Sequence, residues 1–368
     1  MTAPRILVWF WSGGGGGSQY AAQLARRLSM RFGAENVVLS MRAGDPTIAT
    51  ARAAGVCVRT ANIVSSRLKP WASLAGIFDA RRVLAEHARD VDVVIVAMNF
   101  AIAAPLAIGL SKPLVYCAHD PKPHLGDYET HMQRLTQHIL LCRACAVVAM
   151  SGFAANALKD MGVNENKIHV APLASVFEPS ERPQQIGCAP VRLLFLGRMI
   201  EYKGVALLAD SLPFIAHRDD WRRTVAGHGP ALTPTLISRY AHWQVEGLKQ
   251  GWLSEGEISN LLDQHDVILA PYLTASQSGV VAQAMAAGRP CVVTDVGGLA
   301  EQIGDGAGGW IVEEPKAESL AAVLAAVLDD PTQVQEKAKG AAKIARNAWH
   351  TSWWDWIGRP EGPSGRRP

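Results

Sequence analysis

The sequence predicts an α/β protein built from two doubly wound domains that face each other across a cleft. Short apolar runs alternate with helical patterns along most of the chain, which is typical of repeated βα units and parallel sheets. The chain has 368 residues, a length that suits roughly two domains of about 150–200 residues. A segment rich in Pro, Gln and Glu, 178–190, divides the two series and is typical of a linker.

The first domain is expected at residues 1–178. It begins with a buried strand at 6–11, a glycine-rich loop at 12–18 and a helix at 19–32. Further strands are expected at 36–40, 56–58, 93–97, 113–117, 146–150 and 168–171, and further helices at 73–88, 101–109, 130–144 and 152–161. A glycine-rich loop before a helix lets a ligand approach the N–H groups of the helix N-terminus. We therefore expect ligand contact at Gly14, Gly15 and Gly16.

The second domain is expected at residues 190–345. Its strands are expected at 191–197, 222–227, 245–248, 267–270, 291–294 and 309–312, and its helices at 280–287, 317–328 and 331–346. The Trp-rich segment 346–358 is expected to form a short helix that packs on the body of the protein. The tail, 359–368, is rich in Gly, Pro and Arg and is expected to be disordered.

Charge and cysteine content exclude several classes of protein. The net charge is only +3, and no basic run is interleaved with aromatic residues, so nothing predicts a nucleic-acid partner. Most of the six cysteines stand in apolar runs, which fits a reducing cytosol. Cys142 and Cys145 form a CxxC without a second pair, and we expect two core cysteines there rather than a metal or redox site.

Two apolar segments could be mistaken for targeting or membrane signals. The N-terminal run 5–11 is too short for a signal peptide. The uncharged stretch 93–110 contains Asn99, Pro105 and Gly109, so a strand, a loop and a buried helix explain it better than a membrane span. We therefore expect a soluble, cytoplasmic protein.

The stretch 271–298 combines the signals of a ligand site. It follows an apolar strand and continues with a polar loop, a helix that begins at Gly279, a strand and a second loop. Ligands of open α/β sheets bind at the carboxyl ends of strands, and a helix N-terminus favours anions. A phosphate-bearing ligand is the first hypothesis for this stretch.

A second loop adds cations to the same domain. Arg198 and Lys203 follow a buried strand directly, between Gly197 and Gly204. Arg offers a bidentate fork and Lys a mobile point charge, a combination that suits a diphosphate. Between two such domains, the loop at 118–127 of the first domain would face these groups across the cleft.

These motifs resemble those of GT-B glycosyltransferases of family 4. The similar features are the Gly-Arg-x4-Lys-Gly loop at 197–204, the Gly-x-Gly at 227–229, the Ala-Met-Ala-x-Gly-x-Pro-x-Val run at 284–292, the glycine-rich loop near the N-terminus and His119-Asp120 at a strand end. The resemblance covers about residues 6–357. It implies a GT-B fold of two Rossmann-like domains and a metal-independent, retaining hexosyltransferase without cofactor. The expected donor is a UDP- or GDP-sugar, and the expected acceptor is a sugar or lipid-linked hydroxyl in bacterial polysaccharide or glycolipid synthesis.

The resemblance also implies roles for individual residues. Arg198 and Lys203 would hold the donor diphosphate and stabilise the leaving group, and His119 would contact the donor sugar, so these three are the expected catalytic residues. The expected donor-binding residues also include Gly14, Gly15, Gly16, Gly227, Ser276, Gln277, Ser278, Gly279, Val280 and Gln283. The acceptor-side candidates are Asp120, Asp127 and Glu129. The C-terminal segment would cross back to the first domain, and contact with the inner face of the membrane is left open.

One departure from the family concerns two carboxylates. Many members carry two Glu separated by seven residues in the loop and helix that follow the strand at 267–270. The matching positions here are Ala275 and Gln283, and the loop has a Ser-Gln-Ser-Gly sequence instead. Gln283 can still hydrogen-bond a ribose, but without charge.

Two other functions remain as alternatives. The missing carboxylates allow a catalytically degenerate GT-B protein that binds a nucleotide sugar or a partner without transfer. The glycine-rich loop also allows a nicotinamide oxidoreductase, although no acidic residue ends the next strand. Asp90 and Asp92 form a DxD that precedes a strand rather than follows it, so no metal site is expected there.

Overall fold

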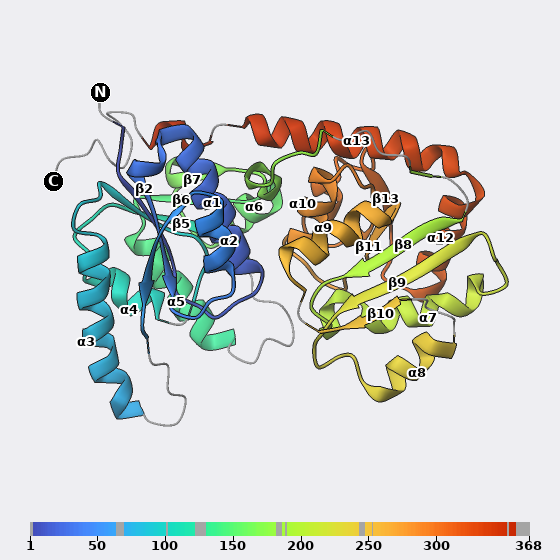
Figure 1. The fold of residues 1–368 in the computed structure, drawn as a ribbon, viewed down its shortest axis with the longest axis horizontal. Coiled ribbons are helices and arrows are strands. Elements are labelled where there is room, and N and C mark those ends of the chain that lie inside the picture. The colour runs from blue at the N-terminus through green and yellow to red at the C-terminus, as the bar shows by residue number, and fades with distance from the viewer. Residues whose placement is uncertain are drawn as a thin grey trace.

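The computed structural model describes residues 3–63, 70–100, 102–121, 130–181, 186–187, 190–242, 247–251, 253–351 and 353–357. Figure 1 shows two α/β lobes side by side, with the last long helix running along the second lobe toward the first. Lobe 1 contains the strands β1 to β7 and lobe 2 the strands β8 to β13.

The lobe 1 sheet has, in the described part of the chain, seven parallel strands in the order β3-β2-β1-β4-β5-β6-β7. The strands are β1 (Ile6–Phe10), β2 (Val37–Arg42), β3 (Cys57–Ala61), β4 (Val93–Val96), β5 (Leu114–Ala118), β6 (Ala146–Ala149) and β7 (Ile168–Val170). The chain order reverses between β1 and β4, so a crevice opens there at the carboxyl ends of the strands. Strands β1, β4, β5 and β6 are buried along their whole length, because helices cover both faces of the sheet.

The lobe 2 sheet follows the same plan, with parallel strands in the order β10-β9-β8-β11-β12-β13. Its strands are β8 (Val191–Leu196), β9 (Trp221–Gly227), β10 (Gly247–Gln250), β11 (Val267–Ala270), β12 (Cys291–Thr294) and β13 (Gly309–Val312). The order reverses between β8 and β11. The two loops that the sequence singles out, after β8 and after β11, therefore leave the sheet on either side of its switch point.

Helices connect the strands of both lobes. In lobe 1 they are α1 (Gly16–Phe32), α2 (Thr47–Ala53), α3 (Pro70–His87), α4 (Ala103–Ile108), α5 (Thr130–Arg143) and α6 (Gly152–Asp160). In lobe 2 they are α7 (Val205–Ile215), α8 (Pro234–His242), α9 (Glu255–Gln264), α10 (Gly279–Ala286), α11 (Leu299–Gln302), α12 (Ala317–Asp329) and α13 (Pro331–His350). Short 3-10 turns complete the chain, among them η3 (Leu173–Val176), η4 (Glu201–Lys203) and η5 (Trp353–Trp356).

The C-terminal segment packs on lobe 1. Trp354 in η5 is buried in the lobe 1 core. Arg27 of α1 stacks on the Trp349 ring with its guanidinium carbon 3.6 Å from the ring centroid, and it also donates a hydrogen bond to the Trp349 carbonyl oxygen. The Trp356 ring stacks on His169 of β7. Aromatic area and cation–π contacts thus tie the end of α13 to lobe 1.

The structure tests the expectation that Cys142 and Cys145 are core cysteines. Cys142, at the end of α5, is exposed, as is Cys57, so the expected pair of core cysteines at the CxxC is wrong: the last turn of α5 presents Cys142 to solvent while Cys145 is half-buried. Cys117 and Cys291 are buried, and burial raises the pKa of the Cys117 thiol to about 12.

Among the described helices, none combines the length and the apolar character that a membrane span requires.

Candidate functional site

The cation loop and the polar loop meet in lobe 2 at the switch point of its sheet. Gly197 directly follows β8, and a Cβ atom there would lie 3.6 Å from the Lys203 Nζ atom and 3.4 Å from the Val280 side chain. Lys203 therefore lies beside the first turn of α10. The first N–H groups of a helix have no partner within the helix, so the Lys203 ammonium and the α10 N-terminus offer positive potential in one place.

A buried tyrosine links Lys203 to this helix. The Lys203 Nζ donates to the Tyr272 hydroxyl oxygen at 2.9 Å, and the Tyr272 oxygen lies 2.9 Å from the Ser278 Oγ. Tyr272 is only 1% exposed. Ser278 is the N-cap of α10 and accepts a hydrogen bond from the Val281 N–H. The chain of contacts fixes the position of the Lys203 ammonium relative to the helix N-terminus.

The loop between β11 and α10 is held rigidly. Gln302 of α11 binds the Ser278 backbone twice, accepting from its N–H at 2.9 Å and donating to its carbonyl at 2.8 Å. Gly297 has a φ of 61°, and a Cβ atom there would overlap the Ala275 carbonyl oxygen, so only glycine fits beside this loop. Such a preorganised loop keeps its backbone groups aimed without a conformational cost when a ligand binds.

The cations of this site have no carboxylate partner among the residues that the structure describes. Among the ion pairs of the described residues, none includes Arg198 or Lys203, and Arg198 is exposed. Within the described part of the chain, the partners of Lys203 are the Tyr272 hydroxyl and the face of the Tyr272 ring, 4.6 Å away. Arg198 follows Gly197 directly, so two uncompensated cations stand at the end of β8. An anion is the ligand that such a pair favours.

The site reaches lobe 1 through Gln277. Its Nε2 donates to the His119 carbonyl oxygen at 3.1 Å, across the boundary between the lobes. His119 follows β5, and its Nδ1 lies 2.7 Å from the Asp120 Oδ2. The structure thus brings His119 and Asp120 to the loop of lobe 2, as the expected cleft requires. Asp127 and Glu129 lie outside the described residues.

A second contact joins the lobes nearby. The Glu301 carboxylate of α11 accepts hydrogen bonds from the backbone N–H groups of Gly152 at 2.7 Å and Phe153 at 3.1 Å. These N–H groups begin α6 of lobe 1, where a negative charge is favourable. Ser151 caps the same helix from within lobe 1. Gln277 and Glu301 together hold the two lobes against each other at the mouth of the site.

The glycine-rich loop of lobe 1, unlike the cation loop of lobe 2, binds a carboxylate of the chain itself. The Gly14 N–H and the Ser18 hydroxyl donate to the Asp45 Oδ2 at 3.0 and 2.6 Å, and the Thr47 N–H donates to its Oδ1 at 2.9 Å. Asp45 is 7% exposed, so its charge lies under the loop. The Gly14 N–H is therefore already satisfied by a carboxylate. Donor contact at Gly14, Gly15 and Gly16 stays a prediction.

A large cavity lies between the lobes beside α9 and α10, and its lining includes no residue of the cation loop or the polar loop. Its volume is 760 Å³, and its lining includes Gln283 of α10, Glu255 and Ser259 of α9, and Gln19 and Gln23 of α1. This volume is within the range of sites that hold a nucleotide-sized ligand. Gln283 therefore faces a cavity, as its expected role requires. Burial raises the pKa of the Glu255 carboxyl, because the surrounding protein disfavours its charged form.

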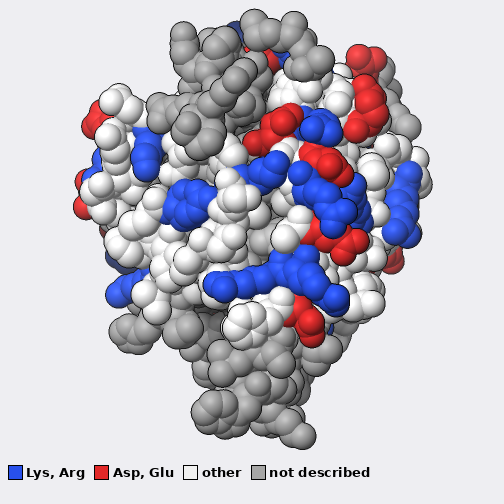
Figure 2. All heavy atoms as spheres, turned by 90° about the vertical axis from the view of Figure 1, so that its left-hand side faces the viewer, with Lys and Arg blue, Asp and Glu red and all other residues white. Residues whose placement is uncertain are grey.

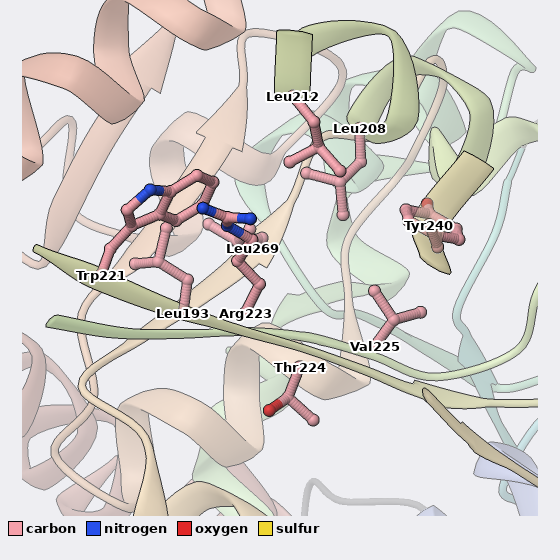
Figure 3. Close-up of a pocket in the computed structure, with 9 residues that line it drawn as sticks. All are labelled: Leu193, Leu208, Leu212, Trp221, Arg223, Thr224, Val225, Tyr240 and Leu269. Atoms are coloured by element: carbon pink, nitrogen blue, oxygen red, sulfur yellow. The ribbon is translucent and has the colours of Figure 1, made fainter. Parts of the chain in front are cut away.

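A further cavity, inside lobe 2, is unsuited to a substrate. Its volume is only 10 Å³, and Figure 3 shows that side chains such as Leu208, Trp221 and Tyr240 converge on it. It has room for about one water molecule. It is a packing gap between the sheet and helices α7 and α8.

The remaining expected donor residues play mainly structural parts. Gly227, at the end of β9, has no room for a side chain, since a Cβ atom would overlap the Gly197 carbonyl oxygen. The Gly227 backbone therefore packs directly against the start of the cation loop. Ser276 is buried, and its carbonyl accepts from the Gly298 N–H at 3.2 Å. No group of three or more His, Cys, Asp or Glu side chains in the described ranges is placed to hold a metal ion.

The comparisons with known proteins agree with this architecture. Residues 14–174 match the family model "Glycosyltransferase Family 4", and residues 190–330 match "Glycosyl transferases group 1". The two lobes are glycosyltransferase domains. HepE from Anabaena, solved in complex with UDP and glucose, superposes with a TM-score of 0.72 over 94% of this chain and 95% of that chain, at 17% identity. The GT-B fold expected from the sequence is thereby confirmed.

Two of the curated relatives of these glycosyltransferase domains are named for the synthesis of bacterial polysaccharides. The amylovoran biosynthesis glycosyltransferase AmsK of Erwinia amylovora is 25% identical over 202 residues, which are 52% of this chain and 45% of that protein. The lipopolysaccharide core biosynthesis mannosyltransferase LpsB of Rhizobium meliloti is 30% identical over 222 residues, 56% of this chain and 62% of that protein. The match thus spans about half the length of these relatives.

Proposed function

We propose that the protein transfers a hexose from a nucleoside-diphosphate sugar to an acceptor hydroxyl, with retention of configuration at the anomeric carbon. The observation that carries the proposal is the uncompensated Lys203 ammonium, fixed by Tyr272 beside the N-terminus of α10. Arg198 at the same strand end supplies a second cation, and the 760 Å³ cavity beside α10 has room for a nucleotide-sized ligand. HepE, which shares the fold, has been solved with UDP and glucose.

The chemistry follows from the charges. The bond between the anomeric carbon and the diphosphate breaks, and the leaving nucleoside diphosphate takes the electron pair. Lys203, Arg198 and the N–H groups of Gly279 and Val280 stabilise the negative charge that develops on the phosphate. The acceptor oxygen then bonds to the anomeric carbon from the same face, and its proton passes to the departing phosphate.

Cations replace a metal in this proposal. A metal ion often neutralises a leaving diphosphate, and here Lys203 and Arg198 would do so as permanent charges. His119 and Asp120 stand on the lobe 1 side, 2.7 Å apart, next to Gln277. We assign His119 to the donor sugar and Asp120 to the acceptor side. Gln283 would contact the ribose from the cavity.

The acceptor is proposed to be a sugar or a lipid-linked saccharide of a bacterial polysaccharide or glycolipid. Support comes from the relatives, whose names place them in amylovoran and lipopolysaccharide core biosynthesis. A lipid-linked acceptor would bring the protein to the inner face of the membrane. Figure 2 shows the outer end of lobe 1, where Lys and Arg lie among Asp and Glu rather than forming a uniform basic patch. Exposed apolar side chains on this lobe, Phe78 on α3 and Ile108 on α4, are candidates for lipid contact.

The test is a transfer assay with UDP- and GDP-sugars and a polyprenyl-linked or lipopolysaccharide core acceptor. The proposal expects release of UDP or GDP that depends on the acceptor, unaffected by a metal chelator, with an α-linked product from an α-linked donor. A product with inverted configuration would refute retention. Loss of turnover with chelator, restored by a divalent cation, would refute the role of the cations.

A second function has one observation in its favour. Ala275 is buried and apolar where related enzymes carry a carboxylate, so the chain could bind a nucleotide sugar without transferring it. Binding of a sugar nucleotide with neither transfer to any acceptor nor hydrolysis would favour this degenerate protein. Turnover above about 1 per second, the lower range of enzymes, would exclude it.

A further inference from the structure

Helix α11 of lobe 2 contacts both lobe 1 and the loop that leads into α10. Its Glu301 accepts hydrogen bonds from the Gly152 N–H at 2.7 Å and the Phe153 N–H at 3.1 Å, one at each carboxylate oxygen. The next residue, Gln302, accepts from the Ser278 N–H at 2.9 Å and donates to the Ser278 carbonyl at 2.8 Å. Two neighbouring side chains of one short helix therefore hold one backbone segment in each lobe.

The contact of α11 with lobe 1 is close on both sides. A Cβ atom at Gly152 would lie 3.2 Å from the Glu301 Oε1, so a larger residue at the start of α6 would crowd the carboxylate. A Cβ atom at Gly298, just before α11, would lie 2.5 Å from the Ser276 carbonyl oxygen and 3.4 Å from the Phe153 Cβ. The start of α11 thus packs between the polar loop and α6, and a change in the position of α6 would displace it.

The Ser278 end of α11's contacts leads to the cation of the site. The Ser278 Oγ lies 2.9 Å from the Tyr272 hydroxyl oxygen, to which the Lys203 Nζ donates at 2.9 Å. Tyr272 is only 1% exposed, so its hydroxyl is confined between these two partners. A continuous series of contacts therefore runs from the start of α6 in lobe 1 to the Lys203 ammonium in lobe 2.

We propose that Glu301 is a positioning residue, which couples the placement of lobe 1 to the placement of the Lys203 ammonium. The coupling passes through Gln302, Ser278 and Tyr272. Its effect on turnover rests on the proposed function, in which Lys203 stabilises the leaving phosphate. Loss of the Glu301 contact frees α11 to shift, and the ammonium is then aimed less well at the charge that develops during reaction. Turnover falls, whereas binding of the nucleotide in the ground state changes little.

The kinetic test is a double-mutant cycle of Glu301→Ala and Tyr272→Phe, with the UDP- or GDP-sugar that turns over fastest. Glu301→Ala should lower kcat about tenfold, the effect of losing hydrogen bonds to a charged group, and leave the Kd of UDP or GDP within twofold of wild type. The double variant should be at most about twofold slower than the slower single variant, because residues of one network do not act additively. Losses that multiply would overturn the inference, since Glu301 would then act independently of Tyr272.

Ser151 gives a matched control at the same end of α6. Its Oγ accepts from the Ala154 N–H at 3.0 Å, within lobe 1. Ser151→Ala therefore removes a hydrogen bond of this helix terminus without removing one between the lobes. It should lower the thermal unfolding midpoint by about 2–4 °C, as the loss of a helix cap does, and leave kcat within twofold. A loss of kcat as large as that of Glu301→Ala would show that the stability of α6 matters rather than its link to α11, and would contradict the inference.

Hydrogen exchange of the protein without ligand tests the coupling independently of any reaction. It is followed by mass spectrometry on a peptide that covers residues 276–283. Glu301→Ala should speed exchange of the Ser278 and Val281 N–H groups at least tenfold, because both depend on the position of Ser278, and Ser151→Ala should not. Unchanged exchange in Glu301→Ala would overturn the inference. If exchange responds as expected but the wild type turns over no UDP- or GDP-sugar, the proposed function fails while the coupling through α11 stands.

Discussion

The glycine-bearing loops after β1 and after β8 both lie between a strand and a helix, but they differ in charge. In lobe 2, the loop after β8 holds Lys203, whose partners among the described residues are a hydroxyl and an aromatic ring. In lobe 1, the loop after β1 covers the buried carboxylate of Asp45, which takes up the Gly14 N–H. The loop after β8 can bind an external anion, whereas the loop after β1 already binds the carboxylate of Asp45. A glycine-rich loop before a helix therefore indicates an anion site only when the chain itself does not supply the anion.

The largest effect is expected from the cation of lobe 2. Lys203→Ala should lower kcat/KM at least 100-fold, since removing one preorganised group that stabilises developing charge costs about 10²–10³. Arg198→Ala should also lower turnover, by less, because Arg198 is exposed and has no buried partner to position it. Steady-state kinetics with the best donor measures both. Thermal unfolding within a few degrees of wild type is the control for folding, and full activity in either variant would remove that residue from the diphosphate site.

The next effect is expected in lobe 1, and on stability rather than on nucleotide binding. Asp45→Ala leaves the Gly14 N–H, the Ser18 hydroxyl and the Thr47 N–H without their acceptor, so the free energy of unfolding should fall by about 2–3 kcal/mol. UDP or GDP affinity should stay within twofold of wild type. Urea unfolding and calorimetry give the two values. Tighter nucleotide binding in this variant would mean that the freed loop takes a phosphate, and the contrast between the loops would be lost.

A smaller effect is expected from the tyrosine that positions the lysine. Tyr272→Phe keeps the ring and its cation–π contact but removes the hydroxyl between Lys203 and Ser278. We expect kcat/KM to fall by about three- to tenfold, the effect of one hydrogen bond, with the loss mainly in kcat. Gln302→Leu, which loosens the same loop without touching Lys203, is the comparison variant. A loss in KM alone would show that Tyr272 serves ground-state binding rather than orientation of the cation.

The smallest expected effect is a gain in nucleotide affinity, from a substitution at Gln283. Gln283 lines the cavity between the lobes, at the position where the resemblance to family 4 implies a carboxylate. Gln283→Glu would give a ribose hydroxyl a charged acceptor, and hydrogen bonds to charged groups are roughly twice as strong as neutral ones. UDP or GDP should bind about two- to fivefold more tightly. Weaker binding would indicate that the carboxyl of Glu255, in the same cavity, repels the new charge.

The fold was predictable because its signals are local. The buried strands β1, β8, β11 and β12 are mostly apolar runs, and their observed bounds differ from the expected ones by at most one residue. Helices α2, α7, α8, α9 and α11 are not predicted, although α9 carries a capping box at Ser254 and Glu257 that the sequence displays. The loops after β8 and β11 were found because glycines, cations and polar residues follow apolar strands.

The partners within the site could not be predicted, because they are distant in sequence. Tyr272 meets Lys203 across 69 residues, Glu301 meets Gly152 across 149, and Gln277 meets His119 across 158. No periodicity or spacing encodes such pairs. Asp45 follows β2 in a turn where an acidic residue is ordinary, and only the topology carries it under the glycine-rich loop of β1. The sequence shows which loops matter, and the structure shows what each loop holds.

The most direct test of the account is calorimetric titration of UDP and GDP into the wild type, Lys203→Ala and Asp45→Ala. The account predicts that one of the two nucleotides binds the wild type, that Lys203→Ala weakens this binding by at least tenfold, and that Asp45→Ala leaves it within twofold. Equal binding to wild type and Lys203→Ala would contradict the account, because the anion site would then lie elsewhere than beside α10.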